Sequence, residues 1–225
     1  MSSSKYAFAH RGGRAHGADN TLDTFREALT RGASGLETDA WLTADGVVVL
    51  DHDGVHRAAR RRQTPLGDVR RELLPAHIPS LDELYDACGT AYDLAIDVRL
   101  PRVGDAIVEV ARRHDALDRL WLVTGSPDHL ATWRASSGQV RLAVSIRLRE
   151  RRTATVEEAR AAGADAVNLR WPWWSRRLVA RVHGLGLLAF GYDVQSRWAS
   201  RRCARLGLDG IFSDHVSRLS TNLGP

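Results

Sequence analysis

Short apolar runs alternate with longer amphipathic segments along the whole chain. The apolar runs predict strands at residues 6–10, 35–41, 47–51, 94–98, 120–124, 142–146, 166–169, 187–192 and 210–213. The amphipathic segments predict helices at residues 21–31, 81–88, 103–114, 127–134, 155–162, 175–183 and 197–206. Strands that alternate with helices are typical of α/β proteins with a parallel sheet.

A glycine-centred turn recurs between three predicted helices and the strands that follow them. Gly32, Gly163 and Gly207 each stand where a helix is expected to end. Glycine adopts the left-handed conformation that ends a helix, and the short connection returns the next strand parallel to the last. With 47–51 counted as an extra hairpin arm, the pattern predicts a (β/α)₈ TIM barrel. A doubly wound open sheet is the alternative.

The chain is expected to form a single domain over residues 1–225, with residues 54–79 as an inserted loop after the second strand region. This segment holds an arginine cluster at 60–62, the prolines Pro65, Pro75 and Pro79, and little apolar periodicity. Loops that follow barrel strands lie on the catalytic face. We therefore expect the insertion to cover or border a substrate site.

Acidic residues stand at two predicted strand ends. Glu37 and Asp39 are two positions apart, so their side chains project to the same face of one strand. Asp97 lies late in another strand. Carboxylates buried together repel one another, and one divalent cation with oxygen ligands, Mg²⁺ or Ca²⁺, would resolve that repulsion. The alternative is that each carboxylate pairs with an arginine.

Basic residues stand at the same end of the predicted barrel. His10 and His52 each follow an apolar run. A pair of imidazoles suits acid–base catalysis, since one can take a proton from a nucleophile while the other gives a proton to a leaving oxygen. Arg11, followed by two glycines, adds a forked cation suited to phosphate.

Composition narrows the range of partners. Hydrophobic residues make up 44% of the 225 residues, which is enough for one sizeable core. The net charge is +5, but arginines alternate with acids along most of the chain and no nucleic-acid-binding motif is present. No apolar run approaches the length of a membrane span, so we expect a cytoplasmic protein without stable membrane insertion or nucleic-acid partner. The sequence leaves the oligomeric state open.

The stretches that hold the polar residues match a known pattern in order and spacing. They read Ala-His-Arg-Gly-Gly at 9–13, Asp-Asn-Thr-Leu-Asp-Thr-Phe at 19–25 and Gly-Leu-Glu-Thr-Asp-Ala-Trp at 35–41, and the match continues to residue 53. Weaker matches follow at 78–84, 192–195 and 208–214. Over essentially its whole length, the chain resembles the glycerophosphodiester phosphodiesterase family.

This resemblance implies a (β/α)₈ barrel, one divalent metal ion and two catalytic histidines. It also implies hydrolysis of small glycerophosphodiesters to glycerol 3-phosphate and an alcohol. Carried over by position, it implies His10 and His52 as the acid–base pair, Arg11 as a phosphate ligand, and Glu37, Asp39 and Asp97 as metal ligands.

Four positions depart from the family pattern. Asp19 and Asp97 stand where the family usually has glutamate, and Tyr192 stands where it usually has tryptophan. Arg99 replaces a usual lysine, which keeps the charge but changes its geometry. Arg99 and Tyr192 remain expected substrate-binding residues.

Three tryptophans follow the strand predicted at 166–169. Trp171, Trp173 and Trp174 would lie in a loop on the catalytic face. They either pack against the insertion as a structural plug, or form an apolar wall in which Trp171 and Trp173 bind the leaving alcohol or an acyl chain.

Two alternative functions follow from these departures. The tryptophans would suit a related barrel enzyme that acts as a lysophospholipase D or sphingomyelinase D. The shorter Asp97 would suit a barrel that binds phosphate esters but has lost efficient catalysis. Metal-dependent turnover distinguishes the enzymes from the binding protein.

Overall fold

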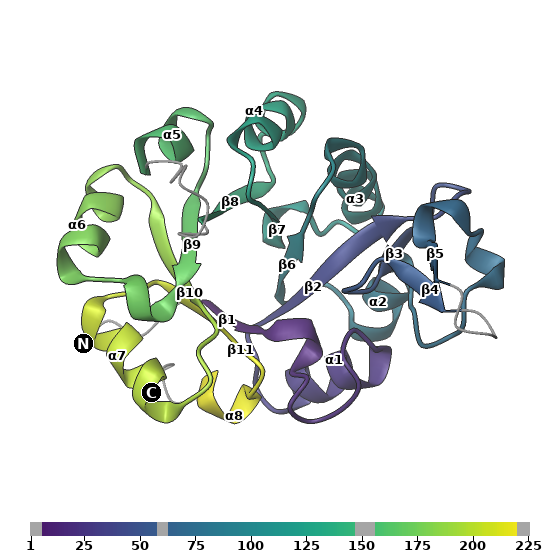
Figure 1. Cartoon of the computed structure of the whole chain (residues 1–225), viewed down its shortest axis with the longest axis horizontal. Coiled ribbons are helices and arrows are strands. Elements are labelled where there is room, and N and C mark those ends of the chain that lie inside the picture. Colours follow the sequence, from purple (N-terminus) through teal and green to yellow (C-terminus); the bar gives the residue numbers. More distant parts are fainter. Residues whose placement is uncertain (1–5, 58–62, 147–155, 220–225) are drawn as a thin grey trace.

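Eight parallel strands close into a barrel at the centre of the molecule (Figure 1). The computed structural model describes residues 6–57, 63–146 and 156–219. The barrel strands are β1 (Tyr6–Ala9), β2 (Gly35–Leu42), β6 (Asp93–Asp97), β7 (Leu120–Thr124), β8 (Arg141–Ile146), β9 (Ala166–Arg170), β10 (Leu188–Tyr192) and β11 (Gly210–Ser213). The barrel closes because β1 pairs in parallel with both β2 and β11. The predicted barrel is therefore confirmed, and the open-sheet alternative is wrong.

Helices surround the barrel, as the amphipathic segments predict (Figure 1). They are α1 (Leu22–Thr30), α2 (Leu81–Cys88), α3 (Pro101–Arg113), α4 (Pro127–Ser136), α5 (Val156–Ala161), α6 (Arg176–Gly184), α7 (Arg197–Leu206) and α8 (Val216–Leu219). The α8 helix was not predicted, and residue 155 of the predicted fifth helix lies outside the described residues. Gly32, Gly163 and Gly207 have φ angles of 90°, 83° and 86°, so the left-handed turns that follow helices are confirmed.

The inward face of the barrel changes from apolar to polar along its strands. The buried interior cluster contains Phe8, Ala95, Trp121, Val123, Ala143, Ala166, Phe190 and Phe212. Ala95 is paired in register with Glu37, and Asp97 with Asp39. Since side chains alternate across a strand, Glu37 and Asp39 also face the interior. The aromatic core thus fills the barrel towards the amino ends of the strands, and polar groups occupy the carboxyl ends.

The described residues of the insertion at 54–79 include regular elements. After β3 (Val48–Leu50), which pairs antiparallel with β2 as predicted, β4 (Val55–Arg57) and β5 (Gln63–Pro65) form a hairpin. Short 3₁₀ turns follow, η2 (Leu66–Asp68) and η3 (Arg71–Leu73). A separate apolar cluster lies beneath them, made of Val49, Leu66, Val69, Leu74 and Ile78. The predicted insertion is confirmed, and its described residues form a hairpin and 3₁₀ turns in addition to loops. The arginines at 60–62 lie outside the described part.

Candidate active site

A cavity of about 530 Å³ opens at the carboxyl ends of the barrel strands. Eight residues predicted from the sequence line it: His10, Arg11, Glu37, Asp39, His52, Asp97, Arg99 and Tyr192. Trp171 and Trp173, which were predicted to bind substrate, are not among the lining residues. The size and mixed polarity of the cavity are those of a small-molecule site.

Buried carboxylates form one wall of this cavity. The Glu37 and Asp39 side chains are only 11% and 10% exposed, and Asp97 faces Asp39 from β6. Burial raises the pKa of Asp39 to about 8, helped by the negative charges of Glu37 and Asp97, although Arg11 and His10 oppose the shift. A negative charge on Asp39 is therefore unfavourable in this wall unless a cation compensates it.

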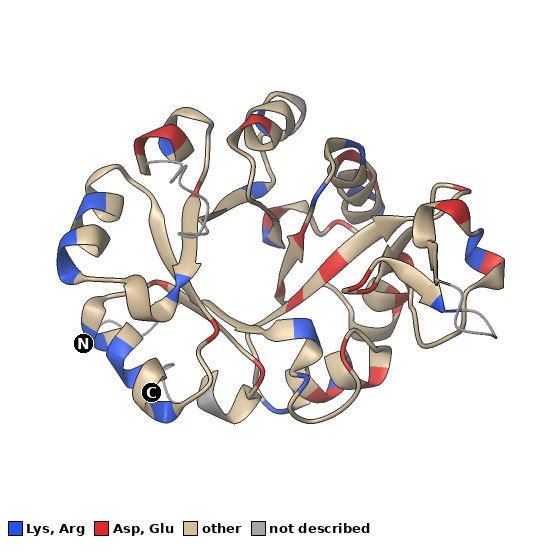
Figure 2. Cartoon of the chain, in the orientation of Figure 1, with Lys and Arg blue, Asp and Glu red and all other residues tan. Residues whose placement is uncertain are grey.

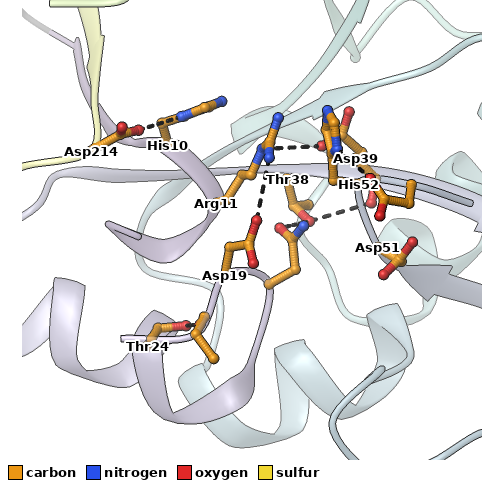
Figure 3. A network of polar contacts seen from close by, with 12 residues as sticks. His10, Arg11, Asp19, Thr24, Thr38, Asp39, Asp51, His52 and Asp214 are labelled. Atoms are coloured by element: carbon orange, nitrogen blue, oxygen red, sulfur yellow. Dashed lines mark hydrogen bonds and ion pairs between the residues drawn. The ribbon is translucent and has the colours of Figure 1, made fainter. Parts of the chain in front are cut away.

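His10 lies between two carboxylates at the start of η1 (His10–Gly12), directly after β1. Its Nδ1 is 2.5 Å from Oδ1 of Asp214 (Figure 3). Its Nε2 is 3.8 Å from Oε2 of Glu37. Burial lowers the pKa of His10, but the charges of Glu37 and Asp214 outweigh this effect, so the pKa is raised. Because an ionised carboxylate only accepts hydrogen bonds, Nδ1 carries a proton and Nε2 is left for a substrate.

His52, like His10, contacts a carboxylate through Nδ1. It follows β3, lines the cavity, and contacts Oδ1 of Asp53 through Nδ1 at 2.9 Å. The hydrogen bond from His52 lowers the pKa of the Asp53 carboxyl. Nδ1 is again the donor, so His52 also presents Nε2 for proton exchange.

Arg11 connects the basic and acidic parts of the site (Figure 3). Its backbone is left-handed, with φ of 51°, and its N–H donates to Oε2 of Glu37 at 2.9 Å. Nη1 donates to Asp19 at 3.2 Å, and Nε lies 3.8 Å from Oδ2 of Asp39. The buried Nε has no hydrogen-bond partner in the described residues. A buried donor of this kind is suited to an anionic oxygen of a ligand.

Trp41 supports Arg99 and the loop that carries His52. The Arg99 guanidinium lies 5.2 Å from the centre of the Trp41 ring. The indole Nε1 donates to the Asp51 carbonyl at 2.7 Å. Gly54 has φ of 71°, and a Cβ atom there would lie 2.5 Å from the same ring. Only glycine therefore allows this close approach beside His52.

The opposite wall carries residues that the sequence analysis did not select. Nδ2 of Asn168, from β9, donates to Oγ of Ser145, from β8, at 3.0 Å. The buried Oδ1 of Asn168 has no hydrogen-bond partner in the part of the chain that is described. Arg170, at the end of β9, donates through Nε to Asp193 at 2.7 Å. This neutral and basic wall faces the carboxylates across the barrel.

Sequence reasoning also assigned no role to Asp214 or Asn20. Asp214 is the first residue after β11, and a charged residue directly after a buried strand is the signal that could have identified it. The Asn20 side chain accepts a hydrogen bond from Oγ1 of Thr38 at 2.9 Å. Its backbone N–H donates to the Arg11 carbonyl at 3.1 Å, so Asn20 holds the Arg11 turn against β2.

The acidic wall fits a hard divalent cation with few protein ligands. Within residues 6–57, 63–146 and 156–219, no group of three or more His, Cys, Asp or Glu side chains is arranged to hold an ion. Glu37 and Asp39 are nevertheless buried together, and the pKa of Asp39 is raised first by burial and then by the negative charges of Glu37 and Asp97. Mg²⁺ commonly binds through one or two carboxylates, with water and substrate phosphate as its other ligands. The residues present fit that donor set.

Two of the tryptophans after β9 pack against residues that do not line the cavity. Trp171, in η5 (Trp171–Trp173), lies edge-on to Trp198 of α7, with ring centres 5.3 Å apart. Trp174 is buried, and its Nε1 donates to the Phe190 carbonyl at 3.0 Å. These contacts give Trp171 and Trp174 packing roles. Binding of a leaving alcohol by Trp171 and Trp173 stays a prediction.

The chain is similar to known glycerophosphodiester phosphodiesterases. The Glycerophosphoryl diester phosphodiesterase family matches residues 10–218. A glycerophosphodiester phosphodiesterase from Bacillus altitudinis is 24% identical over 233 residues, covering 94% of this chain and 95% of that protein.

Solved structures share the fold. The glycerophosphodiester phosphodiesterase of Thermotoga maritima superimposes with a TM-score of 0.81 at 21% identity, over 97% of each chain. An Oleispira antarctica phosphodiesterase, in complex with the product sn-glycerol-3-phosphate, superimposes with a TM-score of 0.84 at 18% identity, over 97% of this chain and 96% of the other.

Proposed function

Since the chain belongs to the glycerophosphoryl diester phosphodiesterase family and is therefore a phosphoric diester hydrolase, we propose that it cleaves glycerophosphodiesters to glycerol 3-phosphate and an alcohol. In this proposal, His10 and His52 are the acid–base pair. One observation carries the proposal. Both histidines direct Nδ1 to a carboxylate and line the cavity that also holds the buried Glu37 and Asp39.

The two imidazoles supply the proton transfers. Asp214 and Asp53 fix the Nδ1–H tautomers, so each Nε2 can exchange a proton with the substrate. One Nε2 takes the proton from the nucleophile, which is water or the 2-hydroxyl of the glycerol. Attack by the 2-hydroxyl gives a cyclic phosphate, which water then opens to glycerol 3-phosphate. The other Nε2 gives a proton to the leaving alcohol oxygen.

Arginines neutralise the phosphodiester. Arg11 presents a buried Nε without a hydrogen-bond partner among the described residues, and this donor can bind a non-bridging oxygen. Arg99, held over Trp41, adds a second positive charge at the cavity. Donors fixed before the substrate arrives stabilise the charge of the transition state without further reorganisation.

Glu37 and Asp39 would hold the divalent cation. Their two carboxylates favour Mg²⁺ over Ca²⁺, because Ca²⁺ takes more oxygen ligands. Asp97 would contribute through a bridging water, since its side chain is one methylene shorter than the glutamate usual in the family. When bound, the cation would act as a Lewis acid on the phosphoryl oxygens.

Release of glycerol 3-phosphate from glycerophosphocholine tests the proposal. We expect Mg²⁺-dependent turnover that EDTA abolishes, with Ca²⁺ assayed in parallel. His10→Ala should lower kcat by about 100- to 10,000-fold, the usual contribution of general acid–base catalysis. The matched control is His183→Ala, because this exposed histidine on α6 lies outside the cavity.

The same assay separates the alternatives. Near-normal turnover by folded His10→Ala would contradict the assignment of the histidines. Turnover with lysophosphatidylcholine but not glycerophosphocholine would favour a lysophospholipase D. Tight binding of glycerol 3-phosphate without turnover of either diester would favour the binding protein.

A further inference from the structure

An exposed surface of arginine and tryptophan lies beside the cavity, on η5, α6 and α7. It consists of Trp173, Arg176, Arg177, Arg197, Trp198, Arg201 and Arg202, and we call it the arginine–tryptophan patch. Figure 2 shows basic segments on the neighbouring helices α6 and α7, at the left of the view. All these side chains are exposed, so the patch can meet a partner without unfolding.

The charge of the patch is not compensated locally. Neither α6 nor α7 contains an acidic residue. The arginines of the patch form no ion pair with any described residue. In contrast, Arg26 and Arg112 on other helices, and Arg31 directly after α1, each pair with an acid three or four positions away. The patch is therefore a local concentration of positive charge suited to an anionic partner.

The tryptophans add exposed apolar area to this charge. Trp198 is 60% exposed and Trp173 is 40% exposed. The Trp198 ring packs against the Trp171 ring, with ring centres 5.3 Å apart, and the Arg202 guanidinium lies 6.0 Å from the centre of the Trp198 ring. Tryptophan combines an apolar ring with a polar N–H, which suits the boundary between lipid headgroups and acyl chains.

The patch adjoins the opening of the active site. Arg170 lines the cavity, and the next residue, Trp171, begins η5 and packs on Trp198. A surface that docks on the patch would consequently lie next to the place where a phosphodiester enters.

We propose that the arginine–tryptophan patch docks the protein on the surface of an anionic lipid bilayer. The tryptophans enter the headgroup layer, and the arginines bind lipid phosphates. Association is peripheral, because no helix in the described residues is long and apolar enough to cross a membrane. The patch covers the outer surfaces of helices and is not a groove, which favours a lipid surface over a nucleic-acid strand. The inference is independent of the chemistry proposed for the cavity.

Sedimentation with lipid vesicles tests the proposal. Vesicles of phosphatidylcholine alone, which are neutral, are compared with vesicles that also contain about 30% phosphatidylglycerol, an anionic lipid. We expect the protein to bind only the anionic vesicles, and to bind more weakly as salt is raised. The triple variant Arg197→Gln/Arg201→Gln/Arg202→Gln should bind about 100-fold more weakly, which corresponds to about 1 kcal/mol for each arginine.

A second triple variant is the matched control. Arg26→Gln/Arg31→Gln/Arg112→Gln removes the same net charge from other helices, and should change binding by less than about threefold, because distant charges are screened. Trp198→Ala should weaken binding about tenfold while leaving its salt dependence unchanged. The patch triple should keep its melting temperature and its hydrolysis of water-soluble diesters, since its residues do not line the cavity.

Several outcomes would overturn the proposal. These are absence of binding to anionic vesicles, equal binding to neutral vesicles, or equal losses in the two triple variants. Binding of an RNA or DNA oligonucleotide that the patch triple loses, without vesicle binding, would assign the patch to nucleic acid instead.

Discussion

Ionised Asp39 destabilises the protein when no cation is bound. Glu37 and Asp39 are buried on the same strand, and burial together with the charges of Glu37 and Asp97 raises the pKa of Asp39 from 3.8 to about 8. An acid whose pKa is higher in the folded state binds its proton more tightly there than in the unfolded chain. Its contribution to stability is therefore complete below pH 3.8 and is lost as pH rises to about 8.

Asp39→Asn should consequently stabilise the metal-free protein. We expect the variant in EDTA to melt several degrees above the wild type at pH 8, and at nearly the same temperature at pH 4, where Asp39 is protonated. Saturating Mg²⁺ should reverse the order at pH 8, because the variant lacks one ligand. Thermal unfolding followed by circular dichroism measures both effects, with the exposed Asp23→Asn as the control. Equal melting temperatures in EDTA at pH 8 would contradict the expectation.

Local patterns identified most of the site residues, but not their partners. The spacing of Glu37 and Asp39 places both side chains on one face of a strand, and His10 follows an apolar run. The contact of His10 with Asp214 joins positions 204 residues apart, so it depends on the closure of β1 against β11. The left-handed backbone of Arg11 likewise depends on tertiary contacts that a sequence pattern does not contain.

The first turn of α2 links the insertion to the barrel. Oγ of Ser80 accepts from the Glu83 N–H at 3.1 Å, and Oε2 of Glu83 accepts from the Ser80 N–H at 2.6 Å. Arg71, from η3 of the insertion, donates to both oxygens of Glu83 at 3.1 and 2.8 Å. The capping box is thus shared between a helix and the inserted segment.

Ser80→Ala should lower the free energy of unfolding by about 1 kcal/mol, the usual value for loss of a helix cap. The measurement is the midpoint of urea unfolding. Ser126→Ala is the matched control, because Ser126 is the residue before α4 but its side chain makes no capping hydrogen bond. A loss as large in Ser126→Ala would show that the cap is not the cause.

The position of a strand or helix was predictable where burial imposes a regular period. The strands at 120–124 and 210–213 have the predicted bounds, since both are buried along their length. The elements inside the insertion were not predicted, because Leu66, Val69 and Leu74 come from 3₁₀ turns and loops, whose spacing follows neither a strand nor an α-helix period.

Cation binding should be measurable as added stability of the entire barrel. A ligand present at 100 times its Kd stabilises the folded state by about 2.7 kcal/mol. In a domain of this size that corresponds to a rise in Tm of about 5–10 °C. We expect Mg²⁺ to give this rise, EDTA to reverse it, and Glu37→Gln/Asp39→Asn to show none. NaCl at equal ionic strength is the control, and an equal rise with NaCl would count against a specific site.

The barrel as a whole was predictable from the alternation of strands and helices, because each short connection forces a parallel return. Closure of the ring was not, since an open sheet produces the same alternation. The pairing of β1 with both β2 and β11 decides between them. The contrast between acidic residues on β2 and arginines on α6 and α7 (Figure 2) also emerges only when distant segments are assembled.

The hydrogen bond between His10 and Asp214 has a consequence for protein synthesis. A nascent chain that has not yet reached β11 can place His10 at the end of β1, but cannot supply the carboxylate that fixes its tautomer. On the proposed mechanism, full hydrolytic competence therefore arises late, when the last strand docks beside the first. The appearance of turnover during translation or refolding would report the joining of these two strands.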